Sequence, residues 1–121
     1  MASKGKMQKY RRLNGKYLKD AEVLLKKGDY SQASEKFWGA CAEIVKAAAA
    51  RNSVHLKTHG DLWDYVLKLH NEKPRLNLAT DFGAVNHLHS NFYEEDLSAT
   101  VVRALAQTSR DFIKKMEKFL G

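Results

Sequence analysis

The spacing of apolar residues is the feature that most constrains what this chain can fold into. Over residues 10–27 they recur at intervals of three and four, at Tyr10, Leu13, Tyr17, Ala21 and Leu24. This spacing places them on one face of an α-helix. Four later segments repeat the pattern, and none shows the sustained two-residue alternation of a strand. Because the connections are short, neighbouring helices should be antiparallel. The sequence therefore predicts an all-α, up-and-down antiparallel bundle of about five helices.

Helix boundaries are indicated by residues that stop or cap helices. Gly28 is a C-terminal stop for the first helix. Thr58 and Asp61 have the spacing of a capping box. The third helix is predicted over residues 59–70, after a loop at residues 52–57. The remaining boundary residues are Asp29 or Ser31 for the second helix, Pro74 for the start of the fourth, and Asp96 for the fifth.

The predicted core consists of one apolar stripe per helix. Gly39 lies inside the second predicted helix, where glycine is unfavourable, and a close approach of a neighbouring helix would explain it. The later stripes are Phe37, Cys41, Ile44 and Ala48; Leu62, Val66 and Leu69; Leu78, Phe82, Val85, His89 and Phe92; and Val101, Leu105, Thr108, Phe112, Met116 and Phe119.

Charge is distributed unevenly along the 121 residues. Residues 1–27 hold nine basic and two acidic side chains, so the whole formal charge of +7 lies there. Residues 1–9 lack apolar periodicity and are predicted to be a disordered basic arm, with a single domain over residues 10–121. A basic arm on a neutral body is typical of contact with a polyanion, although it could also serve solubility alone. The nucleic-acid candidates are Lys9, Arg11, Arg12 and Lys16, together with Arg103, Arg110 and Lys114.

The single cysteine and the lack of long apolar runs bear on the protein's environment. Cys41 has no partner for an intramolecular disulfide, and its helical surroundings predict a small buried hydrophobe. The absence of a disulfide framework favours a reducing, cytoplasmic location. No apolar run approaches the ~18 residues that a membrane span requires, so no membrane association is expected.

Two stretches carry a family resemblance. Residues 28–40, GDYSQASEKFWGA, and residues 88–94, LHSNFYE, resemble the PaREP family of small archaeal proteins in sequence, order and separation. That family is grouped near the HEPN superfamily of helical bundles. The resemblance implies a bundle of four to five helices, frequent dimerisation and a link to nucleotides or RNA. It also implies two further possibilities, ribonuclease activity and a nucleotidyltransferase-type protein partner.

The ribonuclease motif of HEPN proteins does not fit this sequence. That motif is an arginine followed, after four to six residues, by a histidine. Here three residues separate Arg51 from His55, and seven separate Arg51 from His59. An arginine and a histidine supply charge stabilisation and proton transfer to RNA cleavage. No catalytic residue is therefore predicted, and ribonuclease activity is the least favoured function.

His89 is the most informative single candidate for ligand binding. Its helical phase places it between Val85 and Phe92, so it is predicted to be mostly buried with a hydrogen-bonded ring nitrogen. It is either a structural core histidine or a proton carrier in a cleft. Asn91, Tyr93 and Glu94 either end the fourth helix or form the lip of a site. His59 and Arg51 complete the ligand-binding candidates.

Metal and cofactor motifs are not predicted. His87 and His89 point about 200° apart on a helix, which is poor geometry for chelation. The sequence contains no glycine-rich phosphate loop, nucleophile elbow or paired-carboxylate motif. We therefore expect neither a bound metal nor a cofactor.

The leading functional hypothesis is a non-catalytic nucleotide- or RNA-binding accessory module. The alternative is a structural or protein-interaction module that acts as a homodimer or as a partner subunit. A homodimer is predicted because Trp38, Trp63, Val102 and Ile113 add apolar surface beyond the five stripes.

Overall fold

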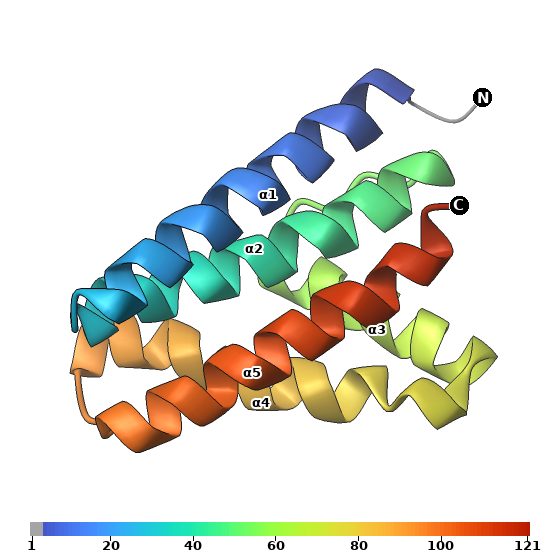
Figure 1. Ribbon diagram of the computed structural model, residues 1–121. Coiled ribbons are helices and arrows are strands. Elements are labelled where there is room, and N and C mark those ends of the chain that lie inside the picture. The colour runs from blue at the N-terminus through green and yellow to red at the C-terminus, as the bar shows by residue number, and fades with distance from the viewer. Residues whose placement is uncertain (1–3) are drawn as a thin grey trace.

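The computed structural model describes residues 4–121, and it confirms the all-α bundle. Within those residues there are five α-helices and no strand. Two short 3-10 helices, Pro74–Leu76 and Glu117–Phe119, adjoin α4 and α5 (Figure 1). The α-helices are α1 (Lys4–Lys26), α2 (Tyr30–Arg51), α3 (His59–Glu72), α4 (Leu78–Glu94) and α5 (Ala99–Met116).

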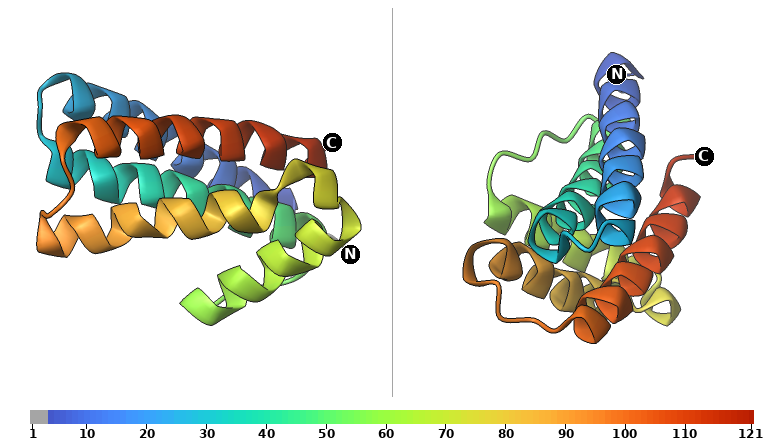
Figure 2. Two further views of the ribbon diagram at one scale, coloured as in Figure 1. Left: turned by 90° about the horizontal axis from the view of Figure 1, so that it is seen from below. Right: turned by 60° about the vertical axis from the view of Figure 1, so that its left-hand side comes forward.

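Helix α2 is the centre of the bundle and contacts each of the other four α-helices. It forms one antiparallel pair with α1, while α4 and α5 form a second pair beside it (Figure 1). Helix α3 is oblique to these four and packs against α2 and α4 near one end of the molecule (Figure 2). No helix in residues 4–121 combines the length and apolar character that crossing a membrane demands.

Small residues let α1 approach α2 closely. The ring of Tyr17 lies over Gly39, where an added Cβ would stand only 3.2 Å from Tyr17 Cδ2. One turn before Tyr17 on α1, the buried Asn14 amide donates a hydrogen bond to the Ala40 carbonyl, at 2.8 Å. The predicted close crossing at Gly39 is therefore present, and a Cβ at this position would press on the Tyr17 ring and make it shift.

Several boundaries agree with the sequence patterns. Gly28 follows α1 with φ of +79°, a conformation that glycine adopts without strain. Asp29, rather than Ser31, caps α2 by accepting a hydrogen bond from the Gln32 amide. Thr58 and Asp61 form the expected reciprocal capping box at the start of α3.

Three helix starts differ from the prediction. Residues 4–9 belong to α1, so this part of the expected arm is helical; residues 1–3 lie outside the described residues. Pro74 begins a 3-10 turn, and the left-handed conformation of Asn77 separates that turn from α4, which starts at Leu78. Ser98, not Asp96, caps α5 through a bond from the Val101 amide.

The buried face of α5 is rotated relative to the prediction. Val102 is fully buried, whereas Val101, which was predicted to face the core, is 42% exposed. Phe112 and Met116 are buried as expected, but Leu105 and Thr108 are only partly buried. The inward face is completed by Ala106, Ser109 and Ile113. Ser109 packs against α2, where Cys41 Sγ lies 3.9 Å from its carbonyl oxygen.

This packing removes the sequence argument for a homodimer. Trp38, Val102 and Ile113 were expected to leave apolar surface uncovered, yet all three are buried within a single chain. Trp63 is partly buried, with its ring edge-on to Phe82 at 4.8 Å. The homodimer thus stays a prediction that rests on the family resemblance.

Asn91 links three parts of the fold. Its side chain is buried, and its amide donates to the Ser34 hydroxyl on α2 at 3.0 Å. Its carbonyl oxygen accepts from the Leu97 amide at 2.9 Å, in the connection between α4 and α5. A residue that was a candidate for the lip of a binding site is therefore a structural bridge.

Replacing Asn91 should destabilise the protein without disturbing an exposed site. Asn91→Ala removes the donor to the Ser34 hydroxyl, which keeps its bond to the Tyr30 carbonyl, and leaves the Leu97 amide without its partner. The loss should cost about 1–3 kcal/mol of unfolding free energy. The control Asn71→Ala alters an exposed residue on α3 and should stay within about 0.5 kcal/mol of the parent. Urea unfolding followed by circular dichroism measures both values. Equal stability of the two variants would contradict the assigned role.

Candidate functional site

Two of the predicted site residues, His59 and His89, come together around Trp38. The imidazole of His59 stacks on the Trp38 indole, with ring centroids 4.8 Å apart and planes within 8°. The His89 ring lies 5.3 Å from both the Trp38 and the His59 rings. Because these residues come from α2, the start of α3 and α4, this histidine cluster forms only when the three helices pack.

A carboxylate on α2 orients the His89 ring. His89 Nδ1 lies 3.1 Å from Glu35 Oε1, and since a carboxylate only accepts hydrogen bonds, Nδ1 is the donor. Its side chain is 33% exposed and that of Glu35 is 27% exposed. The predicted hydrogen-bonded nitrogen is therefore present, and His89 is partly buried at the edge of the core.

The phase of α4 explains the exposure of His89. Leu78, Phe82 and Val85 are buried as predicted, but the inward stripe continues through Leu88 and Asn91. His89 and Phe92 consequently lie at the edge of the packed face. A three-residue step after Val85 is as compatible with a helix as the four-residue step that we expected, so the sequence did not decide between the two.

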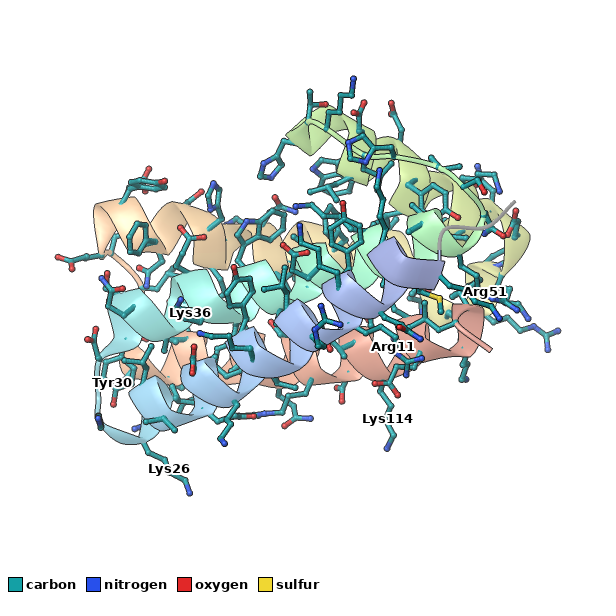
Figure 3. All side chains as sticks on the ribbon, turned by 90° about the horizontal axis from the view of Figure 1, so that it is seen from above. Arg11, Lys26, Tyr30, Lys36, Arg51 and Lys114 are labelled. Carbon is teal, nitrogen blue, oxygen red and sulfur yellow. The ribbon has the colours of Figure 1, made fainter. Side chains whose placement is uncertain are left out.

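The other ligand candidates do not join the histidine cluster as one site. Tyr93 is 71% exposed and meets the His89 ring edge-on at 5.6 Å. Glu94 is the exposed last residue of α4. Arg51 ends α2, where its guanidinium donates to the Phe119 carbonyl at 3.2 Å (Figure 3). It lies thirteen residues from Trp38 on the same helix, a separation of about 20 Å.

A groove between α1 and α2 lies on another side of Trp38. Its volume is about 300 Å³, and its walls include Tyr17 of α1 and Gly39, Ala42, Glu43 and Lys46 of α2. Trp38 and Glu35 also line this groove, which places it next to the histidine cluster. Lys36, on the part of α2 that borders α1, stands with its ammonium 4.9 Å from the Tyr17 ring centroid (Figure 3).

The outward face of α1 carries a line of basic side chains. Its exposed residues follow a three- and four-residue spacing, so they share one face of the helix. We call this the α1 basic ridge and define it as Lys9, Arg12, Lys16, Lys19 and Lys26. Arg11 is exposed beside it. Lys16 pairs with Asp20 at 3.0 Å, and this exposed pair neutralises little of the ridge.

Two of the basic candidates on α5 form hydrogen bonds with other side chains of the protein. Arg110 makes two hydrogen bonds of 2.7 Å to the Glu22 carboxylate on α1 and lies over the Phe37 ring. Arg103 donates to the Tyr30 hydroxyl at 2.8 Å and lies over that ring. Arg110 thus fastens α5 to α1 and is not a free nucleic-acid contact.

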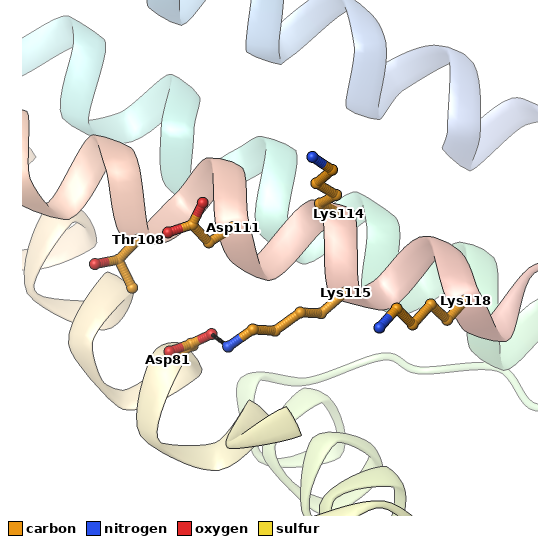
Figure 4. Close-up of a pocket in the computed structure, with 6 residues that line it drawn as sticks. All are labelled: Asp81, Thr108, Asp111, Lys114, Lys115 and Lys118. Carbon is orange, nitrogen blue, oxygen red and sulfur yellow. Dashed lines mark hydrogen bonds and ion pairs between the residues drawn. The ribbon is translucent and has the colours of Figure 1, made fainter. Parts of the chain in front are cut away.

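Lys114 lies at a second pocket, between α4 and α5. This pocket has a volume of about 340 Å³ and contains side chains of both charges (Figure 4). Lys115 crosses it to form a 2.8 Å ion pair with Asp81. Asp111 accepts a hydrogen bond from Gln107 at 3.0 Å. Because acidic groups offset the lysines, this surface is less suited to a polyanion than the α1 basic ridge.

Neither a reactive thiol nor a metal centre is indicated. Burial raises the pKa of the Cys41 thiol to about 12, so it stays protonated at neutral pH. Across residues 4–121, no group of three or more His, Cys, Asp or Glu side chains is arranged to hold a metal ion.

Comparison with known proteins agrees with this architecture. The model of the archaeal PaREP1/PaREP8 family matches residues 9–113. The chain belongs to this family. A crystal structure of a protein from Sulfolobus solfataricus is similar in fold, with a TM-score of 0.79 at 23% sequence identity. The similarity covers 90% of this chain and 97% of that one. The search of curated proteins gives no match.

Membership of the PaREP1/PaREP8 family supports the fold and leaves the site residues to be argued from geometry. Sequence analysis missed Glu35 and Glu43 as site residues. Glu35 lies within the family stretch of residues 28–40, but nothing in that stretch distinguishes it as a site residue, and Glu43 lies outside both stretches. Glu35 is separated from His89 by 54 positions, so only the packed helices show that the two interact. Glu43 and Lys46 are three residues apart on a helix, a spacing that could have indicated a shared face.

The bond between Glu35 and His89 should contribute only modestly to stability. Because both side chains are partly exposed, water replaces the lost partner when either is removed, and the coupling should be about 0.5–1 kcal/mol. A double-mutant cycle of Glu35→Gln and His89→Ala, with urea unfolding as readout, measures it. Coupling above about 2 kcal/mol would instead identify His89 as a core residue.

The pair of Glu22 and Arg110 should give stability a specific pH dependence. Hydrogen bonds from Arg110 lower the pKa of Glu22 below its ordinary value. The pair therefore stabilises the fold above that ordinary value, and the benefit disappears as pH falls through the lowered pKa. Glu22→Gln should reduce stability at pH 7 by less than about 1 kcal/mol, because both side chains are about one-third exposed. In acid the deficit should vanish. A deficit that persists below pH 3, or its appearance in the exposed control Glu117→Gln, would refute this assignment.

Proposed function

We propose that the protein is a non-catalytic RNA-binding module that contacts the RNA backbone through the α1 basic ridge. The observation that carries this proposal is the alignment of five basic side chains on the solvent face of a single helix. From Lys9 to Lys26 the ridge extends over about 25 Å, so it can face several successive phosphates. Contacts of this kind give binding that is sensitive to salt and indifferent to sequence.

The position of α1 in the bundle supports this role. Helix α1 packs mainly along α2, which leaves its opposite face open to solvent. Glu22, one of only two acidic residues in α1, is engaged by Arg110 on α5. The negative charge of Glu22 is therefore neutralised by a cation from α5, while the ridge cations remain exposed. This arrangement favours attraction of a polyanion.

A ribonuclease is less well supported. Arg51, the arginine closest in sequence to His59, is held by the Phe119 carbonyl at the end of α2. His59 and His89 donate ring protons to Asn86 and Glu35, and both pack on Trp38. Among the described residues, the ring and hydrogen-bond contacts of the two histidines include no arginine for charge stabilisation. The placement near HEPN proteins, a homodimer and a nucleotidyltransferase-type partner remain predictions of the family resemblance.

Neutralising the ridge should weaken RNA binding and its salt dependence. The variant with Lys9→Gln, Arg12→Gln and Lys19→Gln removes three exposed cations without touching a buried residue. For a fluorescein-labelled U20 RNA, the slope of log K against log salt should fall in magnitude by about 2. Fluorescence anisotropy at several salt concentrations provides the measurement.

A matched variant separates the ridge from total charge. Lys57→Gln, Lys73→Gln and Arg75→Gln remove the same charge from exposed positions around α3. This control should lose much less affinity than the ridge variant. Equal losses would show that binding depends on net charge alone, and absence of binding by the parent protein would refute the proposed function.

A further inference from the structure

Glu43 has an unusual environment in the groove between α1 and α2. The residue is only 8% exposed, and its Oε2 atom is buried with no hydrogen-bond donor among the described residues. Its other oxygen lies 3.5 Å from the Lys46 ammonium, a long contact. A buried carboxylate oxygen without a donor is costly, so natural proteins rarely retain one without a reason. The groove that this residue lines has room for a small ligand.

We propose that this groove binds a guanine base, free or within RNA, with Glu43 and Lys46 recognising its Watson–Crick edge. Guanine presents two adjacent donors, N1–H and N2–H, and a neighbouring acceptor, O6. A carboxylate accepts two parallel hydrogen bonds, and a lysine donates up to three. Glu43 and Lys46 thus offer the acceptor and donor that complement this edge. The Lys46 ammonium would leave Glu43 Oε1 and move to O6, and the Glu43 side chain would turn so that its buried Oε2 also faces the base.

The other bases fit this pair poorly. Uracil places its single N3–H between two carbonyl oxygens, which a carboxylate repels. Adenine and cytosine each present an amino group beside a ring nitrogen that only accepts, so one carboxylate oxygen would face an acceptor. Specific recognition of RNA commonly reads the Watson–Crick edge of an unstacked base.

The remaining walls suit a nucleotide. At about 300 Å³, the groove is at the lower end of the range for small-ligand sites. Gly39 and Ala42 line the groove beside the Tyr17 ring, which offers an aromatic surface to a planar base. The Lys36 ammonium stands over the same ring, in a position to meet a phosphate. For a base within RNA, the inference rests on the proposed function, because Tyr17 directly follows the ridge residue Lys16.

Three RNAs that differ at one base test the inference. The probes are U12, U12 with one central guanosine, and U12 with one central inosine, which lacks the N2 amino group. Fluorescence anisotropy should show a preference on the order of tenfold for the guanosine RNA over U12, with the inosine RNA between them. Glu43→Gln should abolish the preference while U12 affinity is unchanged. The control Glu117→Gln, at an exposed position, should retain it.

The outcomes distinguish failure of the base site from failure of the ridge. If all three RNAs bind equally and with strong salt dependence, the groove proposal is refuted and the ridge stands. If no RNA binds, the ridge proposal fails, and GMP titrated into the protein decides the groove separately. NMR shifts at Tyr17 and Trp38 that are absent with AMP and lost in Glu43→Gln would support a site for free guanine nucleotide. No such shifts would overturn it, as would a Glu43→Gln variant that differs only in thermal stability.

Discussion

The burial of most of α2 is the constraint on which the rest of the structure depends, since 14 of its 22 residues are buried. A helix that is apolar over most of its circumference must be covered by several neighbours. Alanines at positions 47–50 and Gly39 allow those neighbours to approach closely. The few polar side chains on α2 therefore need partners from other helices. Ser34 is bonded by Asn91 and Glu35 by His89, while Glu43 remains incompletely satisfied. The candidate sites of the protein therefore lie at the few polar side chains of the central helix.

The charge asymmetry of the sequence becomes a spatial one through the position of α1. This helix needs only one apolar face, because it covers α2 and is itself uncovered on the opposite side. Basic residues on that opposite side lose no hydration on folding, so the fold tolerates several of them in a line. The attachment of α1 to α5 through Glu22 and Arg110 also fixes the ridge relative to the bundle. A rigid row of charges faces a polyanion with less loss of conformational entropy than a disordered arm would incur.

The helices, most caps and the core of α2 could be predicted because each depends on local spacing and capping chemistry. The rotation of α4 and α5 could not, since adjacent apolar residues such as Val101 and Val102 are equally good candidates until neighbouring helices are placed. The same ambiguity put His89 in the core in place of Leu88. Sequence did indicate that His59 and His89 were worth examining, but their meeting at Trp38 depends on tertiary packing. Arg110 was misjudged because its partner, Glu22, lies 88 positions away.

Glu35 belongs to both candidate regions, the histidine cluster and the groove between α1 and α2. Its carboxylate accepts from His89 in the histidine cluster, and the residue also lines the groove that contains Glu43. Trp38 similarly lies between the cluster and the groove, with one ring face against His59. His89 bonds only one of the two Glu35 oxygens, so this carboxylate can accept from a ligand in the groove as well. A ligand that turned the Glu35 side chain toward the groove would weaken the hydrogen bond that orients His89, and the histidine cluster would then respond to a ligand that it does not touch.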